Sequence, residues 1–361
     1  FRPARNDNTV YDFANNSHIY SIFTFINDSE FRSAFNIPDY NINLQKVFGE
    51  VNYRVLSSKK VMINNNTVTG DNNIQYISKL KTDFCIDYPG VIWVPADPSN
   101  YSSRAGTPIS AVVIHDIEGS YAGAISWFQN PAANVSAHYV LRSLDGQITQ
   151  MVCEVDKGWH VGSENPYTIG LEHEGFAGQP GWYTQVMYQA SADLVVDICN
   201  DYGINPLRTY SGPACSGSSS SCQLGGCIKI KGHQHYPNQT HTDPGIYWDW
   251  KYFYQLINDS TVVTTYTTAS GTFYDSGGPA SNYADDERSF WLISPAGAAT
   301  LTYLSFDLET DWDYLYIYDG TTVDDPLTGV YTGTNSPGTI TAQSGSFLIE
   351  FRSDCSINNP D

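Results

Sequence analysis

The sequence predicts an α/β domain over residues 85–258 and an all-β sandwich over residues 271–361, joined by a linker at 259–270. In the first segment, β-branched runs alternate with stretches of helical spacing, which is typical of α/β proteins. In the second, short strand-like runs are separated by Gly, Pro and Asn, the signature of a β-sandwich. Residues 1–84 form an N-terminal accessory region, to which the sequence assigns no fold.

Length, hydropathy and charge exclude several classes of protein. The 361 residues exceed what one hydrophobic core usually organises, so we expect two or three domains. No run of about twenty apolar residues occurs, so no segment is predicted to span a membrane. The formal net charge is −20 at pH 7, and residues 262–361 alone carry 2 Lys and Arg against 14 Asp and Glu. Because phosphate binding requires clustered Lys and Arg, this charge excludes a nucleic-acid partner.

The start of the chain and its cysteines favour an exported protein. The chain opens at Phe1 without a methionine, which suits a mature protein whose signal sequence has been removed, although a truncated chain would look the same. Three of the seven cysteines, Cys215, Cys222 and Cys227, crowd a Gly/Ser-rich loop. In an exported protein such crowding indicates a disulfide rather than a metal site. Spacing alone does not fix the connectivity.

Two elements of the α/β domain are predicted early in its sequence. Residues 120–131 place Ala122, Ile125 and Phe128 at helical spacing and end in a proline, which predicts a helix. Strand-like runs flank Leu-Asp-Gly at 144–146. Because Asp-Gly supplies the positive φ angles of a tight turn, these runs predict a β-hairpin.

A longer helix is predicted to pack against the sheet. The stretch YTQVMYQASADLVVDICNDYG ends at Gly203, and glycine commonly terminates helices. Apolar side chains recur on one face of it, as an amphipathic helix requires. This face consists of Met187, Leu194, Val195, Ile198 and Tyr202.

A loop rich in metal-binding side chains runs from Gly232 to Gly245 and reads GHQHYPNQTHTDPG. Its glycines and prolines exclude a regular helix or strand. Imidazole and carboxylate together suit zinc, and a catalytic zinc typically takes three protein ligands and leaves a fourth position for water. If two ligands come from this loop, a third must come from elsewhere. We expect His115 to supply it, because SAVVIHD is predicted to be a buried strand that ends near this histidine.

A second candidate strand, IGLEHEG at 169–175, carries two carboxylates. The strand period of two places Leu171 and His173 on one face and Glu172 and Glu174 on the other. If the apolar face packs on the core, both carboxylates point to whatever lies above the sheet. Spacing alone leaves a catalytic pair and a solvated strand face equally open.

Five motifs occur in a fixed order: VIHD around His115, AHYV at 137–140, IGLEHEG at 169–175, GH at 232–233 and TDPG at 242–245. Together they resemble the zinc-dependent N-acetylmuramoyl-L-alanine amidases, which share a fold with the peptidoglycan recognition proteins. The resemblance covers about half of the chain. It implies a mixed central sheet with flanking helices.

The same resemblance implies a role for each matched residue. His115, His233 and Asp243 match the zinc ligands, and Glu172 matches the glutamate that acts as catalytic base. His241 stands where the family commonly has a lysine that stabilises charge in the transition state. Imidazole supplies that charge only when it is protonated, whereas neutral imidazole can still donate a hydrogen bond.

Other aromatic side chains match positions that line the groove in the family. The resemblance implies substrate binding by His160 and Trp159, within a WHxG block, and a structural or groove-lining role for His138. Trp159 could stack on a sugar or be buried in the core. We expect His235 to support a ligand or to lie on the surface rather than to bind the metal.

The resemblance implies a secreted or cell-surface bacterial hydrolase that acts on peptidoglycan or muropeptides. The bond would be the amide between the lactyl group of N-acetylmuramic acid and L-alanine of the stem peptide. Zinc would activate water and polarise the carbonyl, Glu172 would move the proton, and His241 would hold the oxyanion. Two alternatives stay open, namely a peptidoglycan-binding protein without turnover and a zinc peptidase on the same fold.

The C-terminal segment has motifs of its own. Strands are expected at 301–309, 313–320 and 346–354. The combination of FDLE, DYLYIYDG and FRSD resembles the CUB domain, a jelly-roll sandwich used for binding. This implies a surface glycan or a protein as a partner.

Acidic residues of this segment are candidate calcium ligands. Many CUB domains hold calcium at positions that match Glu309, Asp313 and Asp354, and acidic oxygen ligands from separate loops suit calcium. A solvated acidic rim is the alternative. The paired cysteines of animal CUB domains are missing, and Cys355, the one cysteine of the segment, is expected to pair with a residue beyond the printed chain.

Overall fold

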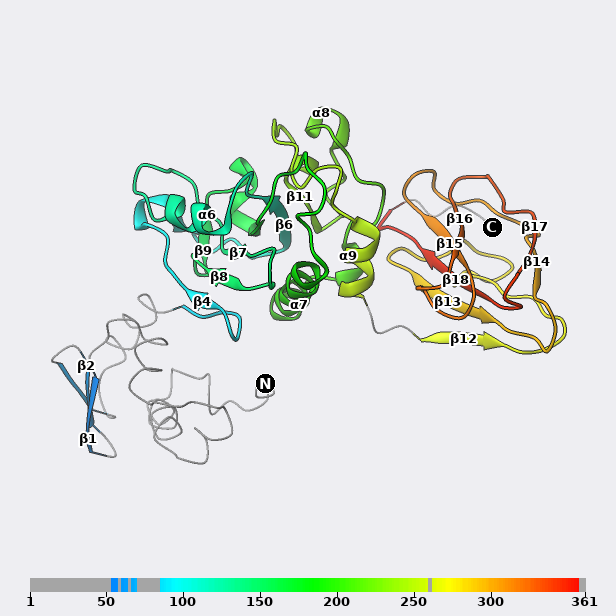
Figure 1. Cartoon of the computed structure of the whole chain (residues 1–361), viewed down its shortest axis with the longest axis horizontal. Helices are drawn as coiled ribbons and strands as arrows, with labels where there is room; N and C mark the ends of the chain where they lie inside the picture. The colour runs from blue at the N-terminus through cyan, green and yellow to red at the C-terminus, as the bar shows by residue number, and fades with distance from the viewer. Residues whose placement is uncertain (1–52, 58–59, 64–65, 70–84, 259–261, 357–361) are drawn as a thin grey trace. The chain divides into compact units, whose positions relative to one another are not determined.

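The computed structural model falls into two compact units, Phe1–Trp93 and Val94–Asp361 (Figure 1). It describes residues 53–57, 60–63, 66–69, 85–258 and 262–356. None of the described helices is both long enough and apolar enough to cross a membrane.

The first unit contains four described strands. β1 (Tyr53–Ser57), β2 (Lys60–Ile63) and β3 (Asn66–Thr69) form an antiparallel sheet in that order. β4 (Ile92–Trp93) lies at the end of the unit. The rest of the accessory region predicted over residues 1–84 lies outside the described residues.

The second unit contributes five strands to a mixed sheet, in the order β11-β6-β10-β7-β8. β6 pairs in parallel with β10 and β11, β10 also pairs in parallel with β7, and β7 and β8 form an antiparallel hairpin. The predicted mixed sheet and the predicted hairpin are therefore confirmed. The strand bounds are β6 (Ala111–Asp116), β7 (Tyr139–Leu141), β8 (Ile148–Gln150), β10 (Thr168–His173) and β11 (Ile230–Gly232).

Helices α6 and α7 cover opposite faces of this sheet. α7 (Gln185–Tyr202) packs on the face to which His173 points, where the His173 ring lies 2.8 Å from Ser191 Oγ. α6 (Tyr121–Phe128) packs on the other face, in one apolar cluster with Val140 of β7. In the parallel register Val140 lies beside Glu172, so α6 shares its face of the sheet with Glu172.

The end of α7 agrees with the sequence, but the buried face of α6 does not. α7 stops at Gly203, whose φ of 65° closes the helix as predicted. For α6 the predicted apolar face was partly wrong: Tyr121, Ala124 and Phe128 are buried, and Ala122 is exposed. The Tyr121 hydroxyl bonds to the hydroxyl of Thr149, which fixes the rotation of the helix.

Shorter elements connect the sheet to the loops around it. β5 and β9 form a separate antiparallel pair, and α9 packs against α7. The bounds are η1 (Pro98–Asn100), β5 (Tyr101–Ser103), β9 (Asp156–Gly158), η2 (Gly162–Tyr167), η3 (Pro206–Arg208), α8 (Ser219–Cys222), η4 (His233–His235) and α9 (Trp250–Ile257).

The C-terminal segment is a β-sandwich, as predicted. One sheet has the order β12-β13-β18-β15-β16 and the other consists of β14 and β17. A cluster that includes Trp291, Leu301, Ile317 and Phe347 fills the space between them. The strand expected over 301–309 is wrong beyond Thr302, because β14 pairs with β17 over three residues only. The bounds are β12 (Val263–Tyr266), β13 (Arg288–Ile293), β14 (Thr300–Thr302), β15 (Tyr314–Asp319), β16 (Leu327–Tyr331), β17 (Thr339–Thr341) and β18 (Phe347–Arg352).

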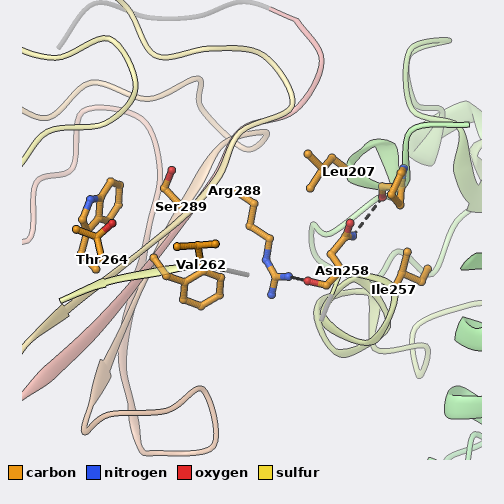
Figure 2. A pocket seen from close by; sticks show the side chains of 10 residues that line it. Leu207, Ile257, Asn258, Val262, Thr264, Arg288 and Ser289 are labelled. Atoms are coloured by element: carbon orange, nitrogen blue, oxygen red, sulfur yellow. Dashed lines mark hydrogen bonds between the residues drawn. The ribbon is translucent and has the colours of Figure 1, made fainter. Parts of the chain in front are cut away.

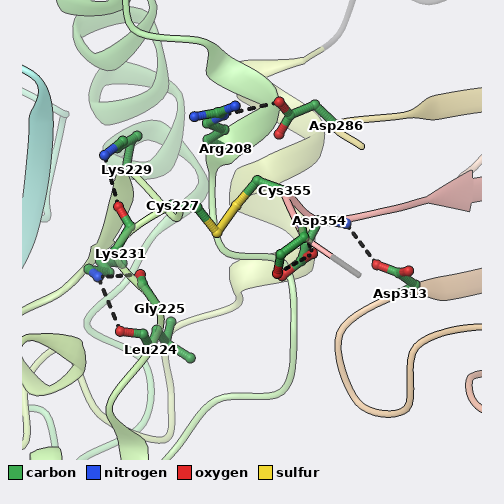
Figure 3. The surroundings of a disulfide bond; sticks show 12 residues. Arg208, Leu224, Gly225, Cys227, Lys229, Lys231, Asp286, Asp313, Asp354 and Cys355 are labelled. Carbon is green, nitrogen blue, oxygen red and sulfur yellow. Dashed lines mark hydrogen bonds and ion pairs between the residues drawn. A yellow bond between two sulfur atoms is a disulfide. The ribbon is translucent and has the colours of Figure 1, made fainter. Parts of the chain in front are cut away.

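A disulfide between Cys227 and Cys355 joins the sandwich to the α/β domain (Figure 3). The expected partner of Cys355 beyond the chain is therefore wrong. The two cysteines are 128 residues apart, and closing a loop of this length stabilises the fold by about 4–5 kcal/mol in the chain-entropy model. Arg208 and Asp286 form an ion pair of 3.0 Å beside the disulfide.

A pocket of about 490 Å³ lies at the same junction (Figure 2). Leu207 and Ile257 line it from the α/β domain, and Thr264 and Phe290 line it from the sandwich. Arg288 crosses the junction and donates a hydrogen bond to the Asn258 carbonyl.

Candidate active site

Two parallel strands deliver the candidate zinc ligands to one edge of the sheet. His115 lies near the end of β6, and His233 directly follows β11, in which Gly232 pairs with Ile114 of β6. The carboxyl ends of parallel strands meet at the same edge, so the two imidazoles become neighbours. A side chain at Gly232 would place its Cβ 2.4 Å from Pro244, so glycine allows the loop that carries Asp243 to close over β11.

The three predicted ligands lie close together. His115 Nδ1 lies 3.0 Å from Asp243 Oδ2, and His233 Nδ1 lies 3.2 Å from Asp243 Oδ1. All three residues are buried, and their ligand atoms lie within 4.8 Å of one another. Ligand atoms at zinc–nitrogen distances in a tetrahedral site are separated by about 3.3 Å. The donor set and its spacing therefore fit zinc.

A chain of hydrogen bonds fixes the proton on His115. The Thr168 hydroxyl donates to the Glu164 carbonyl, so His160 Nε2–H donates to Thr168 Oγ1 at 3.3 Å. In a neutral ring, His160 Nδ1 then accepts from His115 Nε2–H at 2.9 Å. The lone pair of His115 Nδ1 consequently faces the Asp243 carboxylate. Two acceptors at this distance repel each other unless a cation lies between them, which supports the fit to a metal.

Burial and hydrogen bonding set the charges of these residues. Burial lowers the pKa of His115 to about 4. The nearby Asp243 raises this pKa by a smaller amount, so the imidazole is neutral near pH 7. Burial alone would raise the pKa of Asp243, but its close contacts with the His115 and His233 rings hold it below its ordinary value. A neutral imidazole and an ionised carboxylate are the forms that bind metals.

Glu172 lies beside His115 in the register of β10 and β6, so both side chains leave the sheet on the same face. Among the residues that the structure describes, none donates a hydrogen bond to its carboxylate. Burial, together with the charges of Asp243 and Asp116, raises the pKa of Glu172 well above its ordinary value. A carboxylate in this state is suited to accept a proton.

Glu174, two residues further along the chain, has a structural role. Its carboxylate oxygens accept hydrogen bonds from the backbone N–H groups of Tyr121 and Ser143, each at 2.9 Å. It therefore ties the start of α6 to the β7–β8 hairpin. The geometry separates the two carboxylates that spacing alone left equivalent.

His241 lies at the solvent-exposed side of the predicted ligands. Its side chain is 66 % exposed, and its ring stacks on His233 at a centroid distance of 4.5 Å. His241 Nδ1 is 3.8 Å from Asp243 Oδ1. The ring is thus placed beside the ligands and remains accessible to a substrate.

The other aromatic side chains that were predicted to line the groove differ in their surroundings. His160 uses both ring nitrogens inside the protein, which favours orientation of His115 over the predicted substrate contact. His138 is fully buried and accepts a hydrogen bond from Gly170 N–H, which favours its structural role. Trp159 is half-buried, and its indole N–H donates to Ser102 Oγ.

His235 is buried rather than on the surface. Its Nδ1 accepts a hydrogen bond of 3.0 Å from Gly232 N–H. It therefore holds the turn that leads into the loop of residues 232–245, called the metal loop below. It does not belong to the group of converging ligands. This agrees with the expectation that it supports a ligand.

Two supporting residues were not predicted from the sequence: Thr168, which bonds to His160, and Gln239, which bonds to His233. Hydroxyl and amide side chains occur throughout the chain, and no spacing rule connects either of them to a histidine. Only the folded arrangement identifies them.

In the sandwich, Glu309, Asp313 and Asp354 place carboxylate oxygens within 4.8 Å of one another. Burial, followed by the neighbouring carboxylates, raises the pKa of Glu309 to about 7. Burial also raises the pKa of Asp313 to about 6, although Tyr283 donates a hydrogen bond to it. The three predicted residues therefore lie together in an environment that disfavours their negative charge.

Comparisons with known proteins agree with this geometry. A family model described as N-acetylmuramoyl-L-alanine amidase matches residues 105–246. The N-acetylmuramoyl-L-alanine amidase A of Achromobacter lyticus is 46% identical over 174 residues, which are 48% of this chain and 96% of that protein. The chain belongs to the N-acetylmuramoyl-L-alanine amidase family. Its enzyme class is therefore that of the peptidoglycan amidases.

Two solved structures are also similar to part of this chain. A selenomethionine derivative of AmpD is 25% identical, with a TM-score of 0.37, and the match covers 47% of this chain and 96% of that one. The Staphylococcus aureus hydrolase AmiA in complex with its ligand is 20% identical, with a TM-score of 0.34, and the match covers 46% of this chain and 80% of that one.

The segment that follows the amidase domain is a CUB domain. The CUB family model matches residues 262–360. Human multiple epidermal growth factor-like domains protein 8 is 37% identical over 82 residues, and human cubilin is 32% identical over 113 residues. These matches cover 22% and 29% of this chain but only 3% of each relative.

Proposed function

We propose that this amidase hydrolyses the amide bond between N-acetylmuramic acid and L-alanine of the stem peptide, with a zinc ion held by His115, His233 and Asp243. The observation that carries the proposal is the convergence of two imidazole nitrogens on one buried carboxylate. When bound there, zinc would lower the pKa of water and polarise the scissile carbonyl. Peptidoglycan and muropeptides are the expected substrates.

Glu172 is the proposed catalytic base. It leaves the sheet on the same face as His115, and none of the described residues donates a hydrogen bond to its carboxylate. It would accept a proton from the attacking water and deliver it to the departing amine nitrogen of L-alanine. The raised pKa favours the first of these steps, because a carboxylate that binds its proton more tightly is a stronger base.

His241 is the proposed stabiliser of the oxyanion. It is exposed and stacked on His233, so its ring N–H can reach a substrate that lies over the ligands. A hydrogen bond to the carbonyl oxygen would strengthen as negative charge develops there. Trp159 and His160 stay candidates for substrate contact, although the hydrogen bonds of His160 favour its role beside His115.

The CUB domain is proposed to hold calcium through Glu309, Asp313 and Asp354 and to bind a surface glycan or a protein. The support is the spacing of the three carboxylates and the raised pKa of Glu309 and Asp313, since a bound cation would relieve their repulsion. We also propose that the protein acts outside the bacterial cell or at its surface. Its two disulfides support this, because such bonds persist in oxidising compartments.

Mass spectrometry of purified muropeptides after incubation with the zinc-loaded protein tests the proposed reaction. Release of the intact stem peptide from N-acetylmuramic acid is the expected result. A shortened peptide still attached to the sugar would instead identify a peptidase, and unchanged muropeptides that co-elute with the protein would identify a binder. The Glu172→Gln protein, incubated in parallel, controls for a contaminating amidase.

A further inference from the structure

Gln239 lies in the metal loop between His233 and Asp243 and is held at both ends of its side-chain amide. Its Nε2 donates to the carbonyls of Pro237 at 3.1 Å and Val161 at 3.5 Å. Its Oε1 therefore faces the opposite way, and it lies 2.9 Å from His233 Nε2. The amide orientation follows from these partners, since only the nitrogen can donate to carbonyls.

This contact determines which nitrogen of His233 is free. An amide oxygen only accepts, so the His233 Nε2–H must be the donor. A neutral imidazole carries one N–H, and its Nδ1 is then a bare lone pair. That lone pair faces Asp243 Oδ1 at 3.2 Å, the direction in which the predicted metal would lie.

A disulfide-closed segment holds Gln239 in turn. The Ser219 hydroxyl accepts from the Gln239 backbone N–H at 2.9 Å and donates to the Gln239 carbonyl at 2.8 Å. Ser219 begins α8, which is linked to the preceding loop by the disulfide between Cys215 and Cys222. A second attachment runs from Gln234 Nε2 to the Cys215 carbonyl at 2.9 Å. The segment 215–222 is thus tied to the metal loop at two points.

We propose that Gln239 is a positioning residue that fixes the tautomer and the ring orientation of His233 for metal binding, and that the segment closed by Cys215 and Cys222 holds Gln239 in place through Ser219. This inference rests on the proposed zinc site and adds residues that no motif of the family assigns. The free energy of zinc binding then depends on a hydrogen bond outside the group of ligands. Such supporting contacts typically contribute about 10–100-fold to metal affinity.

The dissociation constant for zinc, measured by competition with a chromophoric chelator on the full chain, tests the role of the side chain. Gln239→Leu removes the acceptor and should weaken zinc binding about 10–100-fold. Gln239→Glu restores an acceptor and should bind zinc within a few-fold of the unsubstituted chain or more tightly. Gln189→Ala, on the exposed face of α7, is the matched control and should leave the constant unchanged.

A spectroscopic measurement separates orientation from general loss of structure. In ¹⁵N NMR of the metal-free protein, His233 should show a protonated Nε2 and a bare Nδ1. In Gln239→Leu it should become a mixture of tautomers, while Gln239→Glu keeps the single form. An unchanged tautomer and an unchanged zinc constant in Gln239→Leu would overturn the inference.

The contribution of the disulfide-closed segment is measured in the same assay. Ser219→Ala keeps the disulfide, and we expect zinc to bind more weakly to it, in the direction of Gln239→Leu. The Cys215→Ser/Cys222→Ser double variant should have the same effect. Wild-type zinc constants in both variants would overturn the holding role of the segment. If the unsubstituted chain binds no zinc, the proposed function fails, and this inference fails with it. If Gln189→Ala weakens zinc binding as much as Gln239→Leu does, this inference alone is refuted.

Discussion

Glu172 lies directly beside His115 across the parallel pair of β10 and β6, so a carboxylate and a predicted metal ligand leave the sheet at the same level. The carboxylate oxygens of Glu174, the next acidic residue along the chain, accept hydrogen bonds from two backbone N–H groups. We therefore propose a catalytic role for Glu172 and a structural role for Glu174.

Replacement of the two glutamates should therefore have opposite consequences. Glu172→Gln cannot accept a proton, and we expect kcat to fall by about 10²–10⁴-fold while zinc affinity stays within a few-fold. Glu174→Gln keeps one oxygen acceptor but loses the other, so we expect a lower melting temperature and nearly unchanged kcat. Equal kcat values for the two variants would contradict the assignment. Rates of stem-peptide release and thermal unfolding are the two measurements.

Removal of the carboxylate ligand should abolish turnover. Asp243→Ala leaves His115 and His233 with no anion between them, and we expect zinc affinity to fall by more than the about 100-fold that loss of a supporting contact costs. Asp193→Ala, on the exposed side of α7, is the control. The measurement is zinc content after dialysis together with the rate of amide cleavage. A wild-type rate in Asp243→Ala would show that this carboxylate is no ligand.

The family resemblance predicts a lysine at the position of His241, which allows a direct exchange. His241→Ala removes the proposed donor to the oxyanion and should lower kcat by about 10²–10³-fold. His241→Lys introduces the residue that the resemblance predicts and should retain most of the activity, because an ammonium group also stabilises the oxyanion. Kinetics on one defined muropeptide check this. If the alanine variant matched the unsubstituted enzyme, the oxyanion would have to be stabilised without this side chain.

The ion pairs of the sandwich predict how stability depends on pH. Glu350 is fully buried and accepts from Arg288 Nε at 2.8 Å and from Arg352 Nε at 2.7 Å. Burial would raise its pKa, but the two guanidinium groups hold it below its ordinary value. The stabilisation is therefore complete above the unfolded-state pKa and is lost as pH falls through the lower folded-state pKa.

We accordingly expect Glu350→Gln to lose about 3–5 kcal/mol of unfolding free energy at pH 7, because two buried guanidinium groups lose their counter-ion. The loss should shrink as the pH falls from the unfolded-state pKa through the lower folded-state pKa, because the carboxylate becomes protonated over that range. Chemical denaturation from pH 3 to 7 checks this, with the exposed Asp324→Asn as control. A loss of equal size at every pH would exclude the assigned charge state.

Calcium should stabilise the CUB domain. If Glu309, Asp313 and Asp354 bind the ion, millimolar calcium should raise the melting temperature of the full chain, and Asp313→Asn should remove the increase. Magnesium at the same concentration should do less, since it prefers rigid octahedral geometry. Differential scanning calorimetry in chelator and in calcium measures the shift. Identical curves in both would leave the three carboxylates as a solvated rim.

Much of the fold and of the candidate site could be predicted from the sequence, because these parts depend on local patterns of residues. The strand period separated Glu172 from the core-facing His173, and the apolar run before His115 predicted a buried strand. Gly203 ended α7 as expected. These features depend on residues that are close in sequence, where spacing and geometry are directly linked.

The features that were missed depend on distant contacts. Cys227 and Cys355 are 128 residues apart, so no spacing rule pairs them. The rotation of α6 is set by the hydrogen bond between the hydroxyl groups of Tyr121 and Thr149. Thr149 lies in β8, 28 residues further along the chain. The role of His160 beside His115 likewise appears only when the loop that contains it folds back onto β6.

Anomalous diffraction at the zinc edge, from crystals of the zinc-loaded protein, would locate the metal. We expect one strong peak bonded to His115 Nδ1, His233 Nδ1 and Asp243, with a fourth position open to solvent. A peak at other residues, or none between these three atoms in protein that cleaves muropeptides, would contradict it.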